Sequence, residues 1–243
     1  MTDLARSFER TAEAYELGRP GYAEAALDAL DLPADSVVLD LAAGTGKLTR
    51  QLVARFARVI AVEPLDGMRA VLERMVPKAE ALKGSADEIP LDDASVDAAF
   101  VGEAFHWFAN DDTLAEIARV LRPHGVLAIL FNQLDGDVEP PLPEAFWEAY
   151  RTGAIQKSPE QTVGTGLWQA PFPGPFEPFT EVSYPNPVEL DREGILARVS
   201  SWSMIAALPE SDRKQLLAEL AELLPDELYR HPLRTDLYWA RLR

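Results

Sequence analysis

Short apolar runs alternate with stretches of helical periodicity over the first half of the chain. Three mainly apolar runs, at 37–39, 58–62 and 96–101, have the length of buried strands. Between the first two runs, apolar residues recur at helical spacing at Leu48, Leu52, Val53 and Phe56. Strands that alternate with helices in this way predict an α/β domain built on a mostly parallel sheet.

The same patterns predict elements over the rest of the chain. Further strands are expected at 79–83, 126–131, 176–184 and 234–242. Further helices are expected at 4–17, 22–30, 66–75, 111–121, 143–152 and 190–206, and over the stretch from Leu216 to Leu224. Prolines and aromatic residues are frequent between residues 133 and 187, which favours an ordered insertion over a disordered linker.

The turn after the first strand leads directly into a helix and contains Gly44 and Gly46. Glycine permits such a tight turn and lets a ligand approach the backbone closely. A nucleoside-triphosphate loop is not indicated, because Leu41 stands where its first glycine should be and Leu48 follows the lysine. A dinucleotide-binding turn is disfavoured as well. It needs a small residue at the position that Thr49 occupies here, and Asp40 would repel a pyrophosphate.

An acidic residue, Glu63, ends the second predicted strand. It lies roughly 20 residues beyond the glycines, the spacing at which an acid meets a ribose in a βαβ nucleotide site. A carboxylate accepts hydrogen bonds from both ribose hydroxyls, whereas a phosphate at that place would be repelled. The pattern therefore favours a nucleoside ligand without phosphate.

The apolar run with Asp40, Gly44 and Gly46 resembles motif I of the class I S-adenosylmethionine-dependent methyltransferases. Their cofactor carries an ammonium and a sulfonium group and no phosphate, which suits an acid beside the glycines. The stretch 14–22 resembles the N-terminal lid of many small-molecule methyltransferases, and 121–129 is again similar to the family. The stretch 104–108 resembles a loop of the trans-aconitate methyltransferase-like enzymes of the type 11 group.

The resemblance implies a Rossmann-like sheet of seven mostly parallel strands. Their expected order is 3-2-1-4-5-7-6, with the last strand antiparallel, a helical lid before the sheet and an insertion after strand 5. It also implies a single methyltransferase domain over 1–243. The lid would occupy 1–33, the cofactor-binding core 34–132, and the substrate-side insertion, helices and last strands 133–243.

The resemblance further implies S-adenosyl-L-methionine as cofactor, S-adenosyl-L-homocysteine as product and no metal. The cofactor-binding residues that it implies are Tyr15, Arg19, Asp40, Ala42, Gly44, Gly46, Glu63, Pro64, Met68, Ser85, Ala86, Asp87 and Glu103. The adenine contact stays open between Ser85, Asp87 and the backbone of Ala86, because the family has an acid where this chain has Ser85. For Tyr15, Arg19 and Met68 the alternative is a purely structural role in packing.

The loop after the fourth strand is expected to face the transferable methyl group, because ligands of open α/β sheets lie beyond the carboxyl ends of the strands. The residues expected to line the acceptor pocket are Phe105, His106, Trp107, Trp147 and Trp202. His106 is the titratable group there that could take a proton from a hydroxyl or carboxyl group near neutral pH. The alternative is a structural histidine that orients the loop.

The chain carries a net charge of −17, which disfavours DNA or RNA as a partner because nucleic-acid binding needs a basic surface. The absence of cysteine excludes disulfides, thiolate metal sites and cysteine nucleophiles. The first residues carry no cationic, apolar leader, and no apolar run is long enough to span a membrane, so a cytoplasmic protein without a membrane partner is expected. Its oligomeric state is left open between monomer and homodimer.

The resemblance implies methyl transfer from S-adenosylmethionine, and together with the net charge it favours a small organic molecule as the acceptor. The expected acceptor is an oxygen, in a carboxylate or a hydroxyl group, or another nucleophile. One alternative is a homologue that binds the cofactor without catalysis. A nicotinamide-dependent oxidoreductase is the other, although Asp40 and Thr49 speak against it.

Overall fold

The computed structural model describes residues 12–135, 142–150, 152, 174–225 and 228–243. The chain divides into two compact units. The sheet unit comprises Gly21–Gln133, Gly166–Asn186 and Arg234–Arg243, and the helical unit comprises Met1–Pro20, Leu134–Thr165 and Pro187–Leu233. Two parts of the predictions lie outside the described residues, namely residues 4–11 of the helix predicted at 4–17 and residues 136–141, 151 and 153–173 of the insertion predicted between 133 and 187.

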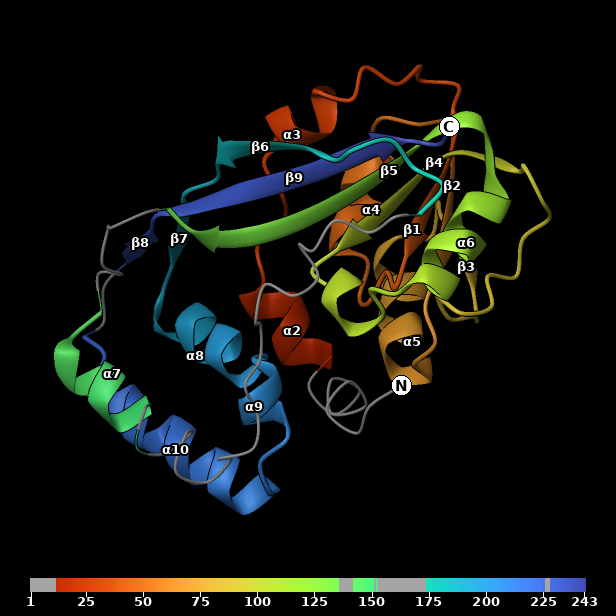
Figure 1. Cartoon of the computed structure of the whole chain (residues 1–243). Helices are drawn as coiled ribbons and strands as arrows, with labels where there is room; N and C mark the ends of the chain where they lie inside the picture. Colours follow the sequence, from red (N-terminus) through yellow and green to blue (C-terminus); the bar gives the residue numbers. More distant parts are fainter. Residues whose placement is uncertain (1–11, 136–141, 151, 153–173, 226–227) are drawn as a thin grey trace. The chain divides into compact units, whose positions relative to one another are not determined.

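The sheet unit is built on a seven-stranded sheet in the order β3-β2-β1-β4-β5-β9-β6 (Figure 1). Its strands are β1 (Val37–Leu41), β2 (Arg58–Val62), β3 (Glu80–Leu82), β4 (Val96–Gly102), β5 (Leu121–Leu134), β6 (Thr180–Pro185) and β9 (Leu233–Arg241). The first five strands in chain order pair in parallel, and β6 pairs antiparallel with β9. The predicted α/β fold and strand order are therefore confirmed, with β9 as the predicted seventh strand.

α3 (Glu24–Asp28) precedes β1, and further helices follow strands of this sheet. These are α4 (Lys47–Leu52), α5 (Asp66–Met75), the short 3₁₀ helix η2 (Phe105–Trp107) and α6 (Asp111–Val120). Asn110 caps α6, because its side-chain oxygen accepts from the N–H of Thr113 at 2.9 Å. The prediction extended α6 by one residue, but Leu121 is already paired with Val96 as the first residue of β5.

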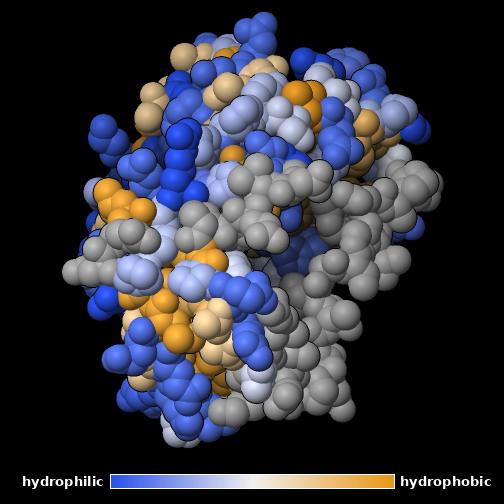
Figure 2. Space-filling view, turned by 90° about the vertical axis from the view of Figure 1, so that its left-hand side faces the viewer, coloured by the Kyte–Doolittle hydropathy of each residue, from blue (hydrophilic) through white to orange (hydrophobic). Residues whose placement is uncertain are grey.

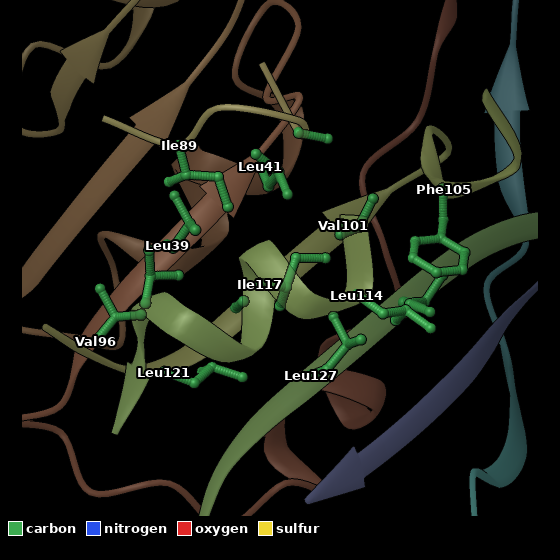
Figure 3. Packing of buried hydrophobic residues seen from close by; sticks show 14 of the residues in the cluster. Leu39, Leu41, Ile89, Val96, Val101, Phe105, Leu114, Ile117, Leu121 and Leu127 are labelled. Atoms are coloured by element: carbon green, nitrogen blue, oxygen red, sulfur yellow. The ribbon is translucent and has the colours of Figure 1, made fainter. Parts of the chain in front are cut away.

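Successive residues of the central strands point to opposite faces of the sheet, and both faces are covered. In β1, Leu39 and Leu41 join a core with Leu114 and Ile117 of α6 (Figure 3), whereas Val38 joins the opposite core with residues of α3 and α4. Burial on both faces explains why the strands are read as continuous apolar runs.

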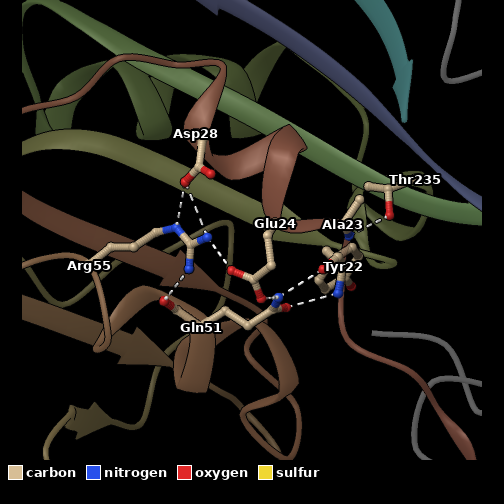
Figure 4. A network of polar contacts seen from close by, with 7 residues as sticks. All are labelled: Tyr22, Ala23, Glu24, Asp28, Gln51, Arg55 and Thr235. Atoms are coloured by element: carbon tan, nitrogen blue, oxygen red, sulfur yellow. Dashed lines mark hydrogen bonds and ion pairs between the residues drawn. The ribbon is translucent and has the colours of Figure 1, made fainter. Parts of the chain in front are cut away.

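A polar network docks α3 on α4 (Figure 4). The Gln51 side chain receives a hydrogen bond from the N–H of Tyr22 and donates one to its carbonyl oxygen, each at 2.8 Å. Arg55 forms ion pairs with Glu24 and with Asp28. Tyr22 is buried in the core beside α4, so its role is the structural docking of this segment.

The helical unit contains α2 (Ala12–Gly18), α7 (Glu144–Tyr150), α8 (Arg192–Ser200), α9 (Ser203–Ala206) and α10 (Glu210–Glu222). It also holds a two-stranded antiparallel sheet of β7 (Val188–Leu190) and β8 (Tyr229–His231), which the sequence did not predict. Its core includes Phe146, Ile195, Leu216, Leu220 and Tyr229.

The helix predicted over 190–206 begins too early and is interrupted, because the structure has two helices, α8 and α9, the second of which ends at Ala206 as predicted. Leu190 belongs to β7, and α8 begins after Asp191, whose carboxylate accepts from the N–H of Gly194 at 2.8 Å. The helix then breaks after Ser200, where the hydroxyl of Ser201 donates to the carbonyl oxygen of Arg198 at 2.6 Å. Such a bond to the backbone competes with continuation of the helix.

Hydrophilic residues cover much of the face shown in Figure 2, and apolar residues form smaller patches between them. This distribution agrees with the net charge of −17. Within the described part of the chain, no helix has the length and apolar character needed to cross a membrane.

Candidate cofactor site

Asp40 lies near the carboxyl end of β1 and is almost fully buried, with 1% of its surface exposed. Thr49, in the first turn of α4, donates from its hydroxyl to Oδ2 of Asp40 across 2.6 Å. The other carboxyl oxygen, Oδ1, is buried and has no hydrogen-bond partner among the described residues. The hydroxyl of Thr45 in the adjoining turn is buried without a partner in the same way.

The glycine turn between β1 and α4 uses left-handed backbone conformations at three positions. These are Ala42 (φ 57°), Gly44 (φ 58°) and Gly46 (φ 88°). A Cβ atom on Gly46 would lie 2.5 Å from Cδ1 of Leu72, so this glycine allows α4 and α5 to approach closely. A Cβ atom on Gly44 would meet no described atom within 4 Å. The backbone at Gly44 therefore borders open space, as a ligand site requires.

Glu63 follows the last residue of β2 and is 4% exposed. Its Oε2 accepts from the N–H of Gly44 at 2.8 Å, and its Oε1 accepts from the N–H of Leu65 at 2.9 Å. These two main-chain bonds fix the orientation of the carboxyl group. Each oxygen keeps a second lone pair for another donor, such as a ribose hydroxyl.

The two carboxyl groups lie on neighbouring strands and influence each other's charge. Burial raises the pKa of Asp40 to about 7, an effect that the bonds from Thr49 oppose and the charge of Glu63 reinforces. Burial likewise raises the pKa of Glu63 to about 7, against the lowering effect of the N–H groups of Leu65 and Gly44. A cation bound beside them would stabilise both charged forms.

These residues fit S-adenosylmethionine. The site offers two buried carboxyl groups, an acceptor atom on Asp40 that lacks a donor, and open space over Gly44. A ligand with an ammonium group, a sulfonium group and a ribose diol supplies the missing charge and the missing donors. A ligand with a diphosphate would add negative charge next to Asp40 and Glu63.

The segment after β3 contains the three predicted adenine contacts. Ala86 is buried, Ser85 is half-buried, and Asp87 is exposed and accepts from the hydroxyl of Thr113 at 3.2 Å. Met68 is 3% exposed within α5. Which of these residues contacts an adenine ring stays a prediction.

Glu103 follows β4 with a left-handed backbone (φ 59°). Its Oε1 accepts from the N–H of Asn132 at 2.6 Å, and its own N–H donates to the carbonyl oxygen of Leu130 at 2.9 Å. These bonds hold the loop to β5. Pro64, the remaining predicted cofactor contact of the sheet unit, is half-buried directly after Glu63.

The predicted acceptor loop forms η2, directly beyond β4. Phe105 is fully buried in the core with Leu114 and Val101 (Figure 3). His106 and Trp107 are half-buried, and the His106 ring lies 4.7 Å from the Trp107 ring and 5.9 Å from the Phe131 ring. His106 is thus set among aromatic side chains, which suits either of its two predicted roles.

Four predicted residues belong to the helical unit. Arg19 donates from Nε to the hydroxyl of Ser201 at 2.9 Å, and its guanidinium lies 5.3 Å from the centre of the Tyr15 ring. Trp147 and Trp202 both pack against the core of this unit, and the ring of Tyr150 lies 6.1 Å from Trp147 and 5.0 Å from Trp202. Their roles towards cofactor and acceptor stay predictions.

The sequence did not identify Thr49 or Thr45 as site residues. In the sequence, Thr49 is visible only as a departure from the dinucleotide pattern. A threonine in the first turn of a helix, however, faces back towards the strand that precedes it. Within the described residues, no group of three or more His, Cys, Asp or Glu side chains is placed to hold a metal ion.

The family described as "Methyltransferase domain" matches residues 39–129, from β1 into β5. An uncharacterized methyltransferase of Mycobacterium tuberculosis is 49% identical over 133 residues, which cover 55% of this chain and 55% of that protein. The match thus spans about half of the length of this mycobacterial relative. An uncharacterized methyltransferase of Schizosaccharomyces pombe is 33% identical over 235 residues, covering 91% of this chain and 88% of that protein.

A solved structure from Anaeromyxobacter dehalogenans, described as a candidate type II methyltransferase, has the same fold. It matches with a TM-score of 0.66 and 27% identity, covering 92% of this chain and 98% of that one. The strand order and the glycine turn define the Rossmann-like class of nucleoside-binding folds. With the matches above, the chain belongs to the class I S-adenosylmethionine-dependent methyltransferases.

Proposed function

We propose that this protein transfers the methyl group of S-adenosylmethionine to an oxygen, carboxylate or hydroxyl, or to another nucleophile of a small organic molecule. The acceptor is taken as small because the net charge of −17 disfavours nucleic acid. The proposal also includes the expectations stated above, namely a cytoplasmic enzyme (EC 2.1.1) without metal or membrane partner that works as a monomer or homodimer.

One observation carries the cofactor part of this proposal. Asp40 and Glu63, both nearly buried, stand at the ends of neighbouring strands beside the open space over Gly44. Without a bound cation, two buried carboxyl groups repel each other and are costly to ionise, although the charge of Arg69 offsets part of this cost at Glu63. A positively charged nucleoside relieves this repulsion, and S-adenosylmethionine is the cofactor of the family.

The chemistry needs positioning more than charge stabilisation. S-adenosylmethionine, when bound, supplies a methyl group that is activated by the positive sulfur. The protein holds donor and acceptor in line and excludes water, so that effective concentration supplies most of the rate. The buried Asp40 and Glu63 serve the first task. The aromatic surroundings of His106 support the second.

His106 is the proposed proton acceptor when the substrate is an alcohol or a phenol. A carboxylate acceptor already carries its negative charge and needs no base. Loss of the His106 imidazole should therefore slow methylation of a hydroxyl group strongly and methylation of a carboxylate weakly. The Tyr15 ring and the Arg19 guanidinium are proposed to contact the carboxylate of the cofactor.

Titration calorimetry tests the cofactor. The protein is titrated separately with S-adenosylmethionine, S-adenosylhomocysteine and NAD. Binding of the first two, without binding of NAD, is expected from the charges at the site. Binding of NAD alone would overturn the proposal and favour the oxidoreductase alternative.

A labelled methyl donor tests catalysis. The protein is incubated with a fractionated metabolite extract and radiolabelled S-adenosylmethionine, and label transferred to an extractable small molecule is counted. Cofactor binding without any transfer, across acidic, hydroxylated and amine-containing fractions, would favour the non-catalytic homologue. A fraction that contains a labelled product allows the acceptor to be identified from that product.

A further inference from the structure

Asp40 and Glu63 are held in different ways. Each oxygen of Glu63 receives a main-chain N–H, from Gly44 and Leu65, so Glu63 is fixed by backbone donors that only a substitution by proline would remove. Asp40 depends on Thr49, whose hydroxyl donates to Oδ2 at 2.6 Å and whose N–H also stabilises the charged carboxyl group. Of the two carboxyl groups, Asp40 is therefore the one whose orientation rests on another side chain.

The Thr49 hydroxyl is itself fully buried. Its backbone is fixed in α4, and Asp40 is fixed in β1 between the paired residues Ala61 of β2 and Phe100 of β4. With both backbones set, the rotation of the Asp40 carboxyl group is the remaining freedom. The bond to Oδ2 sets that rotation and thereby decides where Oδ1 lies.

Oδ1 of Asp40 is buried and has no partner among the described residues. A buried acceptor without a donor is unfavourable, and more so when it is charged. If the Thr49 bond served only to attach α4 to β1, no such cost would be expected in a native site. A buried, unpaired acceptor beside the open turn indicates that a bound ligand supplies the hydrogen-bond donor.

The donor can be identified by chemistry. Of the two cationic groups of S-adenosylmethionine, the sulfonium has no N–H or O–H, whereas the ammonium has three hydrogen-bond donors. The ribose hydroxyls are donors too, but they are assigned to Glu63 at the end of the next strand. Oδ1 of Asp40 is thus suited to the ammonium group.

We propose that Thr49 is a positioning residue for the cofactor: it holds Oδ2 of Asp40 so that Oδ1 accepts a hydrogen bond from the ammonium group of the ligand's amino-acid part. This inference rests on the proposed function. It adds to that function a residue, Thr49, that does not contact the cofactor itself but determines how its ammonium group is bound.

Two ligands separate this role from a general structural one. S-adenosylhomocysteine carries the ammonium group, whereas 5′-methylthioadenosine has the same adenosine and thioether without the amino-acid part. Calorimetry with Thr49→Val should show affinity for S-adenosylhomocysteine reduced about tenfold or more, which corresponds to about 1.4 kcal/mol. Affinity for 5′-methylthioadenosine should stay within about twofold, and Thr49→Ser should restore binding of S-adenosylhomocysteine.

Ser183→Ala is the matched control. Ser183 donates to Oδ1 of the buried Asp236 at 2.6 Å, the same bond at the same length, but on β6 and β9, away from β1 in the strand order. This variant should bind both ligands like the wild type. Thermal unfolding without ligand shows that each variant is folded, and Thr49→Ala is measured with the same expectations if Thr49→Val does not fold.

Two results would overturn the inference. Either the Thr49 variant binds S-adenosylhomocysteine as the wild type does, or it weakens both ligands equally, as a general disturbance of the site would. Failure of the proposed function is a different result, because then the wild type itself binds neither S-adenosylmethionine nor S-adenosylhomocysteine.

Discussion

The N–H of Gly44 donates to Oε2 of Glu63 across 2.8 Å, and this bond joins the glycine turn after β1 to the end of β2. Glu63 thereby has two tasks: it closes the turn, and it faces the site with its remaining lone pairs. Substitutions at this site can separate its structural contribution from its contribution to binding.

Glu63→Ala should weaken the binding of S-adenosylmethionine about tenfold or more, because a charged acceptor for the ribose is lost. Glu63→Gln should lose less, since its amide oxygen can still accept one bond. Glu80→Ala, which removes an exposed acid that pairs with Arg58 at the start of β2, should bind normally. The measurement is calorimetric titration, and unchanged affinity in Glu63→Ala would show that the ribose assignment is wrong.

The two glycines of the turn should respond differently to alanine. Gly46→Ala should lower the free energy of unfolding by about 2 kcal/mol or more, because its Cβ would collide with Leu72 at 2.5 Å and its φ is 88°. Gly44→Ala should lower it by about 1–2 kcal/mol, the strain of a left-handed alanine without a collision.

Gly44→Ala should affect ligand binding more strongly than its moderate effect on the free energy of unfolding would suggest. The added methyl group of Gly44→Ala enters the open space that a ligand would use, so affinity for S-adenosylmethionine should fall about tenfold or more. Urea unfolding and calorimetry on the same preparations give both numbers. A Gly44→Ala protein with normal affinity would mean that the ligand does not approach this backbone.

The stability of the ligand-free protein should fall as the pH rises. Burial raises the pKa of both Asp40 and Glu63 to about 7, whereas in the unfolded chain these groups titrate near about 4. The folded state therefore holds protons more firmly, so its extra stability is complete below about pH 4 and is lost through about pH 7. Between about pH 5 and pH 8 we expect a loss of about 1 kcal/mol or more in urea unfolding.

Asp40→Asn is the control for this pH dependence, since an amide does not titrate. The difference in unfolding free energy between the wild type and this variant should change with pH in the stated direction. A difference that is constant from acid to alkaline pH would contradict the raised pKa of Asp40.

Cofactor binding should release protons near neutral pH. At about pH 7 each of the two carboxyl groups is about half protonated, and a bound cation favours their charged forms. We expect about half a proton to one proton released per molecule bound, falling towards zero at about pH 9. Calorimetry in buffers of different ionisation enthalpy measures this number, and a value of zero at pH 7 would contradict it.

The fold could be predicted because its signals are local. The parallel strands β1, β2 and β4 are apolar on both faces, each is followed by a helix, and the acids Asp40 and Glu63 mark the ends of β1 and β2. Connections of this kind have a fixed handedness, so few strand orders are available. The resemblance to a known family then indicated the place of the C-terminal strand.

The parts that could not be predicted depend on partners distant in sequence. Arg19 bonds Ser201, 182 residues away, and no local pattern announces such a contact. The pairing of β7 with β8 joins two three-residue strands too short to show periodicity. The bond from Thr49 to Asp40 spans nine residues, but it depends on the tight turn that brings the first residues of α4 back to β1.

The position of β9 has a consequence for synthesis on the ribosome. β9 lies between β5 and β6, yet it follows both in the chain, so the long edge of β5 has no neighbour until residues 233–241 have emerged. An open edge of this kind invites pairing with other chains. The growing polypeptide is therefore most exposed to aggregation during the roughly one hundred codons between β5 and β9.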